Sequence, residues 1–259
     1  MQRHTFNQLA HYTFDSLNSH ALIHAISARH GGVSPAPFDS LNLSRSTGDD
    51  PANVQTNMNR LLSALALAPE TLIQASQAQA DGVAIVDTRH RGTIVQGVDA
   101  LLTQTPGVTL ILRFADCVPI LLFDPVQHAI GLVHAGWRGT VLKIVTQAVQ
   151  TMFGTFGTRP RDLTACIAPS IGPCCYRIGE DVSAQVRNAF ANVDDFLISQ
   201  PDGIHLNLWQ VNAAQLRALG VEQIEITDLC TAHRTDEFFS HRAEHGKTGR
   251  FGVVIALKS

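Results

Sequence analysis

The sequence predicts an α/β to α+β fold in which strands and helices pack in layers around one central sheet system. Apolar patterns typical of strands and of helices alternate along the chain. The chain has 259 residues, of which 45% are hydrophobic, so it can bury a large core without disulfide bonds. No internal repeat, low-complexity tract or Pro- or Ser-rich linker interrupts it. We therefore expect a single domain over residues 1–259.

The first half of the chain predicts one helix followed by strands. A helix is expected from residue 51, because Asp49-Asp50-Pro51 combines an N-cap residue with a proline suited to the first helical position. Its apolar face comprises Val54, Met58, Leu61, Leu62 and Leu65. Apolar runs then predict strands at residues 83–86, 108–114, 120–123 and 129–133.

The second half of the chain predicts further helices and strands, with a strand as the last element. Thr140 is expected to cap a helix whose apolar face comprises Val141, Ile144, Val145, Ala148 and Met152. The remaining expected elements are a strand at 164–168, helices at 180–191 and 206–219, and strands at 222–227 and 251–257. This order of elements is typical of a layered fold with mixed sheets.

Composition excludes several classes of protein. Charged residues make up 16% of the chain, against about 25% in a typical domain, and the net charge is −3. Low charge with high hydrophobicity excludes a disordered chain, and there is no basic field for nucleic acid or an anionic membrane. No run of 18 apolar residues predicts a membrane span, and the N-terminal segment does not resemble a signal peptide. Five cysteines are an odd number, so we expect free thiols in the cytoplasm.

The segment 115–139 holds the most informative pair of residues, Cys117 and His134. Two apolar runs flank Asp124-Pro125-Val126-Gln127, whose composition is typical of a turn. If these four residues form the loop of a hairpin, Phe123 pairs with His128, and Cys117 lies directly opposite His134. A thiol and an imidazole this close can share a metal such as zinc, form a nucleophile–base pair, or only pack together.

Neighbouring residues extend this candidate site. Asp116 could act as a general acid or base, or orient the imidazole. The segment 134–140, HAGWRGT, leads into a helix, and its glycines let a ligand approach the backbone closely. The free N–H groups of the helix N-terminus, together with Arg138, predict a site for an anion.

These segments resemble the signatures of the YfiH/DUF152 family, also called the laccase-domain (polyphenol oxidase) or purine nucleoside phosphorylase family. FADCVPILLFDP and GLVHAGWRGT are similar to its two central motifs. SARHGGVSPAPFDSLNL, GDDPANVQTNMNRL, APSIGPCCYRIGEDV and DLCTAHRTDEFFSHRAEHGKTGRFG resemble other family segments in the same order. The resemblance implies a single-domain layered α/β sandwich with mixed sheets.

The resemblance also implies one metal centre, usually of zinc. The family's ligands are a His in a Gln-Val-His motif, the Cys of Asp-Cys, and the His of His-Ala-Gly-Trp-Arg-Gly. The last two correspond to Cys117 and His134, but Gln79 stands where the first His is expected. An amide oxygen is a weak zinc ligand beside imidazole or thiolate. We therefore expect zinc to be weakly bound, absent, or held by a substitute ligand; the candidates are His30, His90, His241 and His245.

The resemblance implies an enzyme acting on purine nucleosides, as monomer or homodimer. The implied reactions are phosphorolysis of adenosine, inosine, guanosine and methylthioadenosine, and deamination of adenosine. Phosphorolysis needs cationic groups for phosphate, and the candidates are Arg29, Arg138, Arg242, Lys247 and Arg250. Deamination needs an activated water, which a metal on Cys117 and His134 would provide, with Asp116 as a candidate proton carrier.

Three other functions remain open. The chain could be a metal-free hydrolase with Cys117 as nucleophile and His134 as base. It could be a non-catalytic purine-binding module with a degenerate metal site. A copper polyphenol oxidase is least supported, because the family expectation for multicopper sites is paired His-x-His ligands and the sequence contains none.

The remaining cysteines are expected to differ in role. Cys166 lies in a predicted strand and should be part of the core. Cys174 and Cys175 are adjacent, which is poor geometry for a mutual disulfide, and their Gly-Pro loop is expected to line the pocket. Cys230 closes a strand and is expected to pack near the site. Trp137 is a candidate for stacking on a purine.

Overall fold

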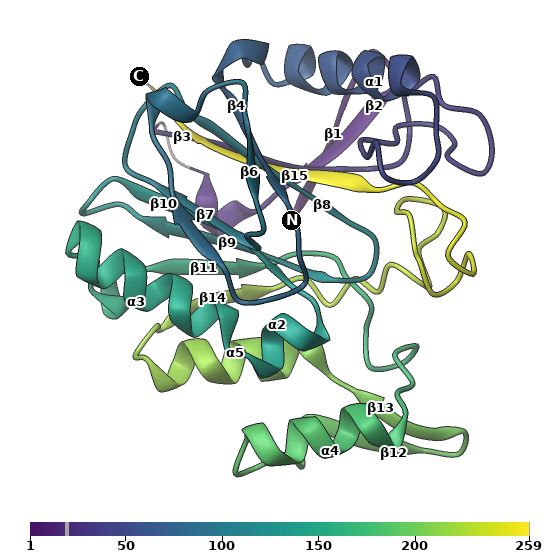
Figure 1. The fold of residues 1–259 in the computed structure, drawn as a ribbon, viewed down its shortest axis with the longest axis vertical. Helices are drawn as coiled ribbons and strands as arrows, with labels where there is room; N and C mark the ends of the chain where they lie inside the picture. Colours follow the sequence, from purple (N-terminus) through teal and green to yellow (C-terminus); the bar gives the residue numbers. More distant parts are fainter. Residues whose placement is uncertain (19–20, 259) are drawn as a thin grey trace.

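Two β-sheets packed face to face form the centre of the molecule (Figure 1). The computed structural model describes residues 1–18 and 21–258. The first sheet has seven strands, which are, in spatial order, β1 (Gln2–Phe6), β2 (Leu9–Thr13), β3 (Leu22–Ser27), β15 (Phe251–Leu257), β8 (Thr109–Phe114), β4 (Leu72–Ser76) and β6 (Ile94–Gln96). Two facing sheets therefore replace the single central sheet system that the sequence predicts.

The second sheet has six strands and carries the predicted hairpin. Its strands are, in spatial order, β14 (Gln223–Ile226), β11 (Thr164–Ile167), β9 (Val118–Asp124), β10 (Ala129–Ala135), β7 (Ala100–Thr103) and β5 (Val83–Ile85). Strands β12 (Leu197–Gln200) and β13 (Gly203–Leu206) form a separate hairpin. Both large sheets mix parallel and antiparallel pairs, for example parallel β4–β8 and antiparallel β9–β10. The mixed α/β class with mixed sheets is therefore confirmed.

Helices cover the outer faces of both sheets (Figure 1). Helix α1 (Pro51–Ala64) lies over the first sheet, and α2 (Trp137–Val141), α3 (Ile144–Phe156) and α5 (Leu208–Ala218) lie over the second. Helix α4 (Glu180–Ala189) lies beside the β12–β13 hairpin at the edge of the molecule. Short 3-10 helices span Asp15–Leu17, Pro69–Thr71, Thr88–His90 and Pro160–Asp162.

Alternation of side chains along the strands explains the layers, because successive residues point to opposite faces of a sheet. In β9, Leu121 and Phe123 join the core between the sheets, whereas Ile120 and Leu122 face the helical layer. In β8, Ile111 instead packs toward α1 with Leu61 and Leu62. Strands buried on both faces read as continuous apolar runs, which is why the sequence identifies them easily.

The predicted helix starts are confirmed at α1 and wrong at Thr140. The Asp50 side chain accepts a hydrogen bond from the Ala52 N–H at 2.8 Å, and Pro51 is the first helical residue. Thr140 lies inside α2, which begins after Gly136, and α3 starts only after Lys143 turns the chain with φ +62°. The Thr140 hydroxyl accepts from the Asn212 amide at 3.1 Å and so joins α2 to α5.

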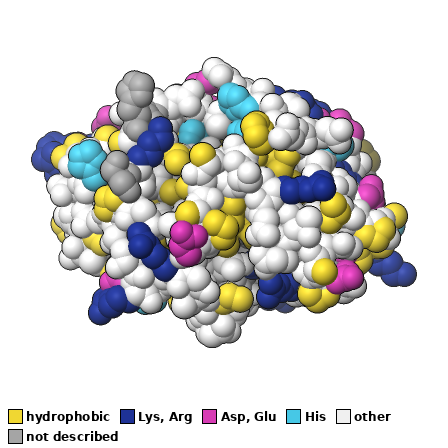
Figure 2. All heavy atoms as spheres, turned by 90° about the horizontal axis from the view of Figure 1, so that it is seen from above, with side chains coloured by type: hydrophobic (Ala, Val, Ile, Leu, Met, Phe, Trp, Pro, Cys, Tyr) yellow, Lys and Arg dark blue, Asp and Glu magenta, His cyan; other side chains and the backbone are white. Residues whose placement is uncertain are grey.

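The outer surface carries no concentration of one charge in the view of Figure 2. Lys and Arg side chains are scattered among acidic and hydrophobic ones on the described part of that face. This agrees with the net charge of −3. Within residues 1–18 and 21–258, no helix has the length and apolar character needed to cross a membrane.

A buried histidine predicts a loss of stability in acid. His24 is 5% exposed, and its Nε2 accepts the Phe14 N–H at 2.8 Å, which requires the neutral ring. Burial lowers the pKa of His24 to about 4. Because the unfolded chain takes up this proton near pH 6.5, the contribution is intact above that pH and is lost as the pH falls toward 4. We expect a loss of about 2 kcal/mol from this group at pH 5.

Urea unfolding at pH 7.5 and pH 5 measures this effect. His24→Gln keeps an acceptor for the Phe14 N–H but does not titrate, so it should be less stable than wild type at pH 7.5 yet lose less stability on acidification. His30→Gln, at a partly exposed site, is the matched control and should behave as wild type. An equal loss in wild type and His24→Gln would contradict the assignment.

Candidate active site

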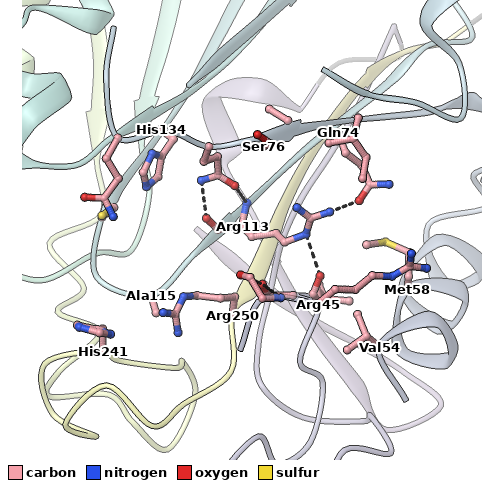
Figure 3. A pocket seen from close by; sticks show the side chains of 18 of the residues that line it. Arg45, Val54, Met58, Gln74, Ser76, Arg113, Ala115, His134, His241 and Arg250 are labelled. Carbon is pink, nitrogen blue, oxygen red and sulfur yellow. Dashed lines mark hydrogen bonds between the residues drawn. The ribbon is translucent and has the colours of Figure 1, made fainter. Parts of the chain in front are cut away.

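A cavity of about 910 Å³ opens beside the carboxyl end of β8 and the start of β9 (Figure 3). It extends from Cys117 and His134 to Val54 and Met58 of α1. Segments 171–176 and 241–250 supply other parts of its wall, including Tyr176, His241 and Arg242. The volume lies in the range of sites for small molecules.

Cys117 and His134 both line this cavity, but the predicted register between them is wrong. Phe123 pairs with Ile130 rather than His128, and His134 pairs with Pro119. The reason is Asp124, which stays in the strand and accepts the Val126 and Gln127 N–H groups at 2.8 and 3.0 Å, so the turn begins one residue later.

The shift leaves the two side chains on one face of the sheet. It moves each partner by two residues, and side chains alternate with a period of two. Cys117 is therefore the diagonal neighbour of His134 instead of its direct partner. A Cβ atom added at Gly136 would lie 3.1 Å from Cys117 Sγ, so this glycine leaves room for the thiol against the backbone.

Asp99, which the sequence argument missed, holds His134 in place. Its carboxylate is fully buried, and Oδ1 lies 2.7 Å from His134 Nδ1. The backbone N–H groups of Ala78, Gln79 and Ala80 also donate to this carboxylate, at 2.9 to 3.1 Å. The His134 N–H donates to the Asp99 backbone oxygen at 2.7 Å, which ties β10 to the start of β7.

The three residues form a chain of charge interactions, Asp99–His134–Cys117. Burial alone would lower the pKa of His134, but Cys117 and Asp99 on either side of the ring outweigh burial and raise it to about 9. Burial would likewise raise the pKa of Asp99, yet the bonds from His134 and the Ala80 N–H hold it below its usual range. The contact with Asp99 therefore orients the ring and commits Nδ1 to the carboxylate.

The donor set around Cys117 and His134 falls one ligand short of a catalytic zinc site. Such sites use three protein ligands. Gln79 lines the cavity and adopts a left-handed backbone with φ +57°, but it offers only an amide. Among the described residues, no third His, Cys, Asp or Glu completes a metal-binding group with this pair. Of the proposed substitutes, His241 lines the cavity, whereas His30, His90 and His245 do not.

Gln79→His is expected to create the missing ligand. Histidine tolerates the left-handed region better than most residues, so the backbone should not change. Relative to wild type, the variant should gain close to one equivalent of zinc, measured by mass spectrometry of the dialysed protein. Adding Cys117→Ser should remove that gain, and Gln96→His, on an exposed strand end, should not produce it. Equal zinc content in wild type and Gln79→His would contradict this prediction.

Asp116 ties three segments of the cavity wall together. It lines the cavity with φ +84°, and its Oδ1 accepts the hydroxyls of Thr231 and Ser240, both at 2.7 Å. Its Oδ2 accepts the Arg242 N–H at 2.6 Å, and its backbone oxygen accepts the Ile171 N–H at 2.9 Å. The geometry therefore favours Asp116 as a residue that positions the wall.

Four arginines give the cavity its charge, and only two of them were predicted. Arg242 and Arg250 line it as expected, together with Arg45 and Arg113. In the described chain their side chains donate to neutral oxygens, such as the Gln55 amide, the Leu43 carbonyl and the Arg177 carbonyl. Asp116 is the one acidic residue in the described lining. The cavity is thus suited to an anion.

Arg113 is the most buried of these cations. It lies inside β8, and Figure 3 shows it bonded to Gln74 between the ends of the cavity marked by His134 and Met58. Burial and the nearby Arg45 lower its pKa to about 10, so it remains charged. A charge in a strand that otherwise reads as core was the signal that could have identified it.

The other predicted basic residues do not line the cavity. Arg29 is buried and donates to the Thr235 carbonyl and Glu244, at 2.8 and 3.1 Å. Arg138 stacks on Trp137, with Cζ 4.4 Å from the ring centroid. Lys247 lies in the segment before Arg250 without reaching the cavity wall. Arg29 therefore connects loops. Trp137, on which Arg138 stacks, does line the cavity.

The remaining cysteines are all free. Cys166 is buried in the core, as predicted. Cys174 and Cys175 do not line the cavity, contrary to expectation; they lie close to Cys230 instead. Tyr176, the next residue, does line it, and burial raises the pKa of its hydroxyl.

Comparisons with known proteins agree with this architecture over nearly the whole chain. A family model described as "Multi-copper polyphenol oxidoreductase laccase" matches residues 23–258. A purine nucleoside phosphorylase of Bacteroides thetaiotaomicron is 36% identical over 256 residues, covering 93% of this chain and 95% of that protein. Crystal structures of YlmD from Geobacillus stearothermophilus and of the hypothetical protein YfiH from Bacillus licheniformis are both 32% identical, with TM-scores of 0.93 and 0.91. They cover 99% and 98% of this chain, and 98% and 97% of their own.

Proposed function

The chain belongs to the YfiH-like laccase-domain family, and from this premise we propose that it is a purine nucleoside phosphorylase. The observation that carries the proposal is the cavity, where Arg45, Arg113, Arg242 and Arg250 lie beside the Asp99–His134–Cys117 chain. Phosphate needs unpaired cations, and a departing purine needs a proton. Relatives named purine nucleoside phosphorylase, at 36% and 38% identity, support the same class.

In the proposed phosphorolysis, the cavity arginines and the Asp99–His134–Cys117 chain have different roles. A phosphate oxygen bonds to the sugar C1′ while the bond from C1′ to the purine nitrogen breaks, giving a sugar 1-phosphate and a free base. The arginines hold the phosphate and orient one oxygen. We assign the proton that the purine takes up to the His134 imidazolium, whose Nδ1 is held by Asp99. No step is assigned to a metal, because the donor set is incomplete.

The volume and lining of the cavity support the proposed range of nucleosides. Its volume of about 910 Å³ leaves room for a nucleoside together with phosphate. Val54, Met58 and Leu62 form an apolar stretch of the lining, which suits the methylthio group of methylthioadenosine. We propose adenosine, inosine, guanosine and methylthioadenosine as substrates of phosphorolysis. Deamination of adenosine, which needs an activated water, is proposed as a secondary activity only for protein that holds a metal at Cys117 and His134.

Incubation with adenosine, with and without inorganic phosphate, tests the proposal. We expect adenine to appear only with phosphate, and Cys117→Ala, His134→Ala and Arg113→Met to abolish or strongly reduce it. Inosine formed without phosphate would show deamination alone. No turnover under either condition would leave the protein as a purine-binding module and would contradict the proposal, as would phosphate-independent release of adenine.

A thiol-dependent hydrolase is the second candidate, and one observation favours it. Asp99, His134 and Cys117 have the order of orienting acid, base and nucleophile that activates thiols in other enzymes. Incubation with iodoacetamide followed by peptide mass spectrometry would reveal a reactive Cys117. Phosphate distinguishes the two candidates, because a phosphorylase consumes phosphate and a hydrolase does not.

A further inference from the structure

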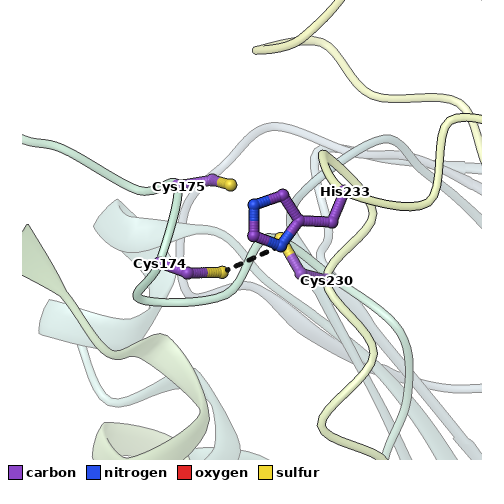
Figure 4. Close-up of side chains that lie close together, drawn as sticks. All are labelled: Cys174, Cys175, Cys230 and His233. Atoms are coloured by element: carbon purple, nitrogen blue, oxygen red, sulfur yellow. Dashed lines mark hydrogen bonds between the residues drawn. The ribbon is translucent and has the colours of Figure 1, made fainter.

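A second group of chemically reactive side chains lies outside the cavity. Cys174, Cys175, Cys230 and His233 come from two loops, the first after β11 and the second after β14 (Figure 4). Their three sulfur atoms and one imidazole nitrogen all lie within 4.8 Å of one another. None of the four lines the cavity, and the phosphorylase proposal uses none of them.

Backbone hydrogen bonds hold these two loops side by side. Ser170 and Cys230 form a parallel bridge, in which the Thr231 N–H donates to the Ser170 oxygen at 3.0 Å. Each loop then makes a tight turn: the Cys175 N–H donates to the Gly172 oxygen, and the His233 N–H donates to the Cys230 oxygen. The backbone therefore brings the donor atoms together.

Gly172 allows the sulfur atoms to approach. A Cβ atom there would lie 3.2 Å from Cys174 Sγ, 3.2 Å from Cys230 Cβ and 2.7 Å from the Trp209 ring. The Gly172 N–H also donates to Cys230 Sγ at 3.2 Å. Cys174 Sγ lies 3.6 Å from His233 Nδ1 (Figure 4).

We propose that Cys174, Cys175, Cys230 and His233 bind one Zn²⁺ ion in a tetrahedral site separate from the cavity. Three thiolates and one imidazole are a common donor set of structural zinc sites, and their spacing allows all four to reach one ion. Binding releases three thiol protons to solvent and leaves a site of net charge −1. Cys174 and His233 are exposed, so the ion can enter from solvent.

The ion would stabilise the wall of the cavity. The first loop continues into Tyr176, and the second continues toward His241 and Arg242, all of which line the cavity. Asp116 already joins these segments through Thr231, Ser240 and Arg242. A zinc ion adds a second connection, so its removal should lower the melting temperature. This inference does not depend on the proposed phosphorolysis.

Metal analysis in a Cys117→Ser background isolates this site from the cavity. We expect the full-length variant, purified under reducing conditions, to retain close to one equivalent of zinc. Cobalt substituted for zinc should give a charge-transfer absorption with the intensity of three thiolates. Adding Cys174→Ser or His233→Ala should lower the zinc affinity at least 10-fold, whereas adding Cys166→Ser, a thiol outside the cluster, should not change it.

Several results would overturn the inference. Zinc content unchanged by both Cys174→Ser and His233→Ala would do so, as would copper in place of zinc, or a disulfide between cluster cysteines in metal-free protein. If the cluster variants do not fold, the cobalt spectrum of Cys117→Ser alone decides: no thiolate band means no site. A chelator should lower the melting temperature of Cys117→Ser but not that of a folded cluster variant.

Discussion

Replacing Asp99 with asparagine is expected to lower kcat/KM for phosphorolysis by about 100-fold or more, because His134 loses the group that orients it. The carboxylate accepts the His134 ring N–H and three backbone N–H groups, all while fully buried. An asparagine side chain has one acceptor oxygen and adds a donor, so it leaves buried N–H groups unpaired. We therefore also expect a loss of stability of about 2–4 kcal/mol.

A matched control separates these two effects. Asp124 is another fully buried carboxylate, at the turn of the β9–β10 hairpin that carries His134, where it accepts the Val126 and Gln127 N–H groups. Asp124→Asn removes a buried charge outside the site and should keep kcat/KM within about threefold of wild type, since the site is intact. Steady-state kinetics well below the melting temperature of each variant provide the comparison. If Asp99→Asn also stays within threefold, Asp99 does not position His134 for the reaction.

The second large effect is expected from Arg113→Met. Methionine preserves the length of the buried side chain but removes the charge that we assign to phosphate. Charge-assisted hydrogen bonds are worth about 1.5–3 kcal/mol each, so the KM for phosphate should rise about 10- to 100-fold. The KM for the nucleoside should change much less, because the proposed contact is with phosphate alone.

Two further variants support the interpretation of Arg113. Arg113→Lys should recover part of the phosphate affinity, since a single ammonium replaces the planar guanidinium. Arg91→Met removes a surface arginine bonded to the Gly107 carbonyl and should leave both KM values unchanged. A phosphate KM for Arg113→Met equal to that of wild type would show that this arginine serves only the fold.

The sequence predicts individual elements better than their contacts. Asp50 and Pro51 identify the start of α1 because capping is a local interaction. Strands β8, β9 and β10 are recognisable because burial on both faces produces continuous apolar runs. Strands β1, β2 and β3 were not recognised, since polar residues interrupt their patterns, as in QRHTF and LAHYT.

Site residues that follow a local sequence pattern were predicted, whereas residues that join the site only through tertiary contacts were missed. Cys117 and His134 were predicted to lie on one face of a hairpin. This prediction still holds, because the error in register, caused by Asp124, shifts each partner by two residues. Asp99 meets His134 only because β7 and β10 are neighbours, a pairing between segments far apart in sequence. Arg45 and Arg113 likewise converge from different elements. The segment of Arg45 carries no signal, whereas Arg113 is distinguished as a charge within an apolar strand.

The measurement that tests the central claim most directly is phosphorus NMR of wild-type protein with adenosine and inorganic phosphate, combined with chromatography of the released base. The account predicts that phosphate is consumed, that a sugar 1-phosphate resonance grows, and that free adenine appears in a one-to-one ratio with it. The Asp99→Asn and Arg113→Met variants should slow all three changes together. Adenine or inosine formed while the phosphate signal stays constant would contradict the account.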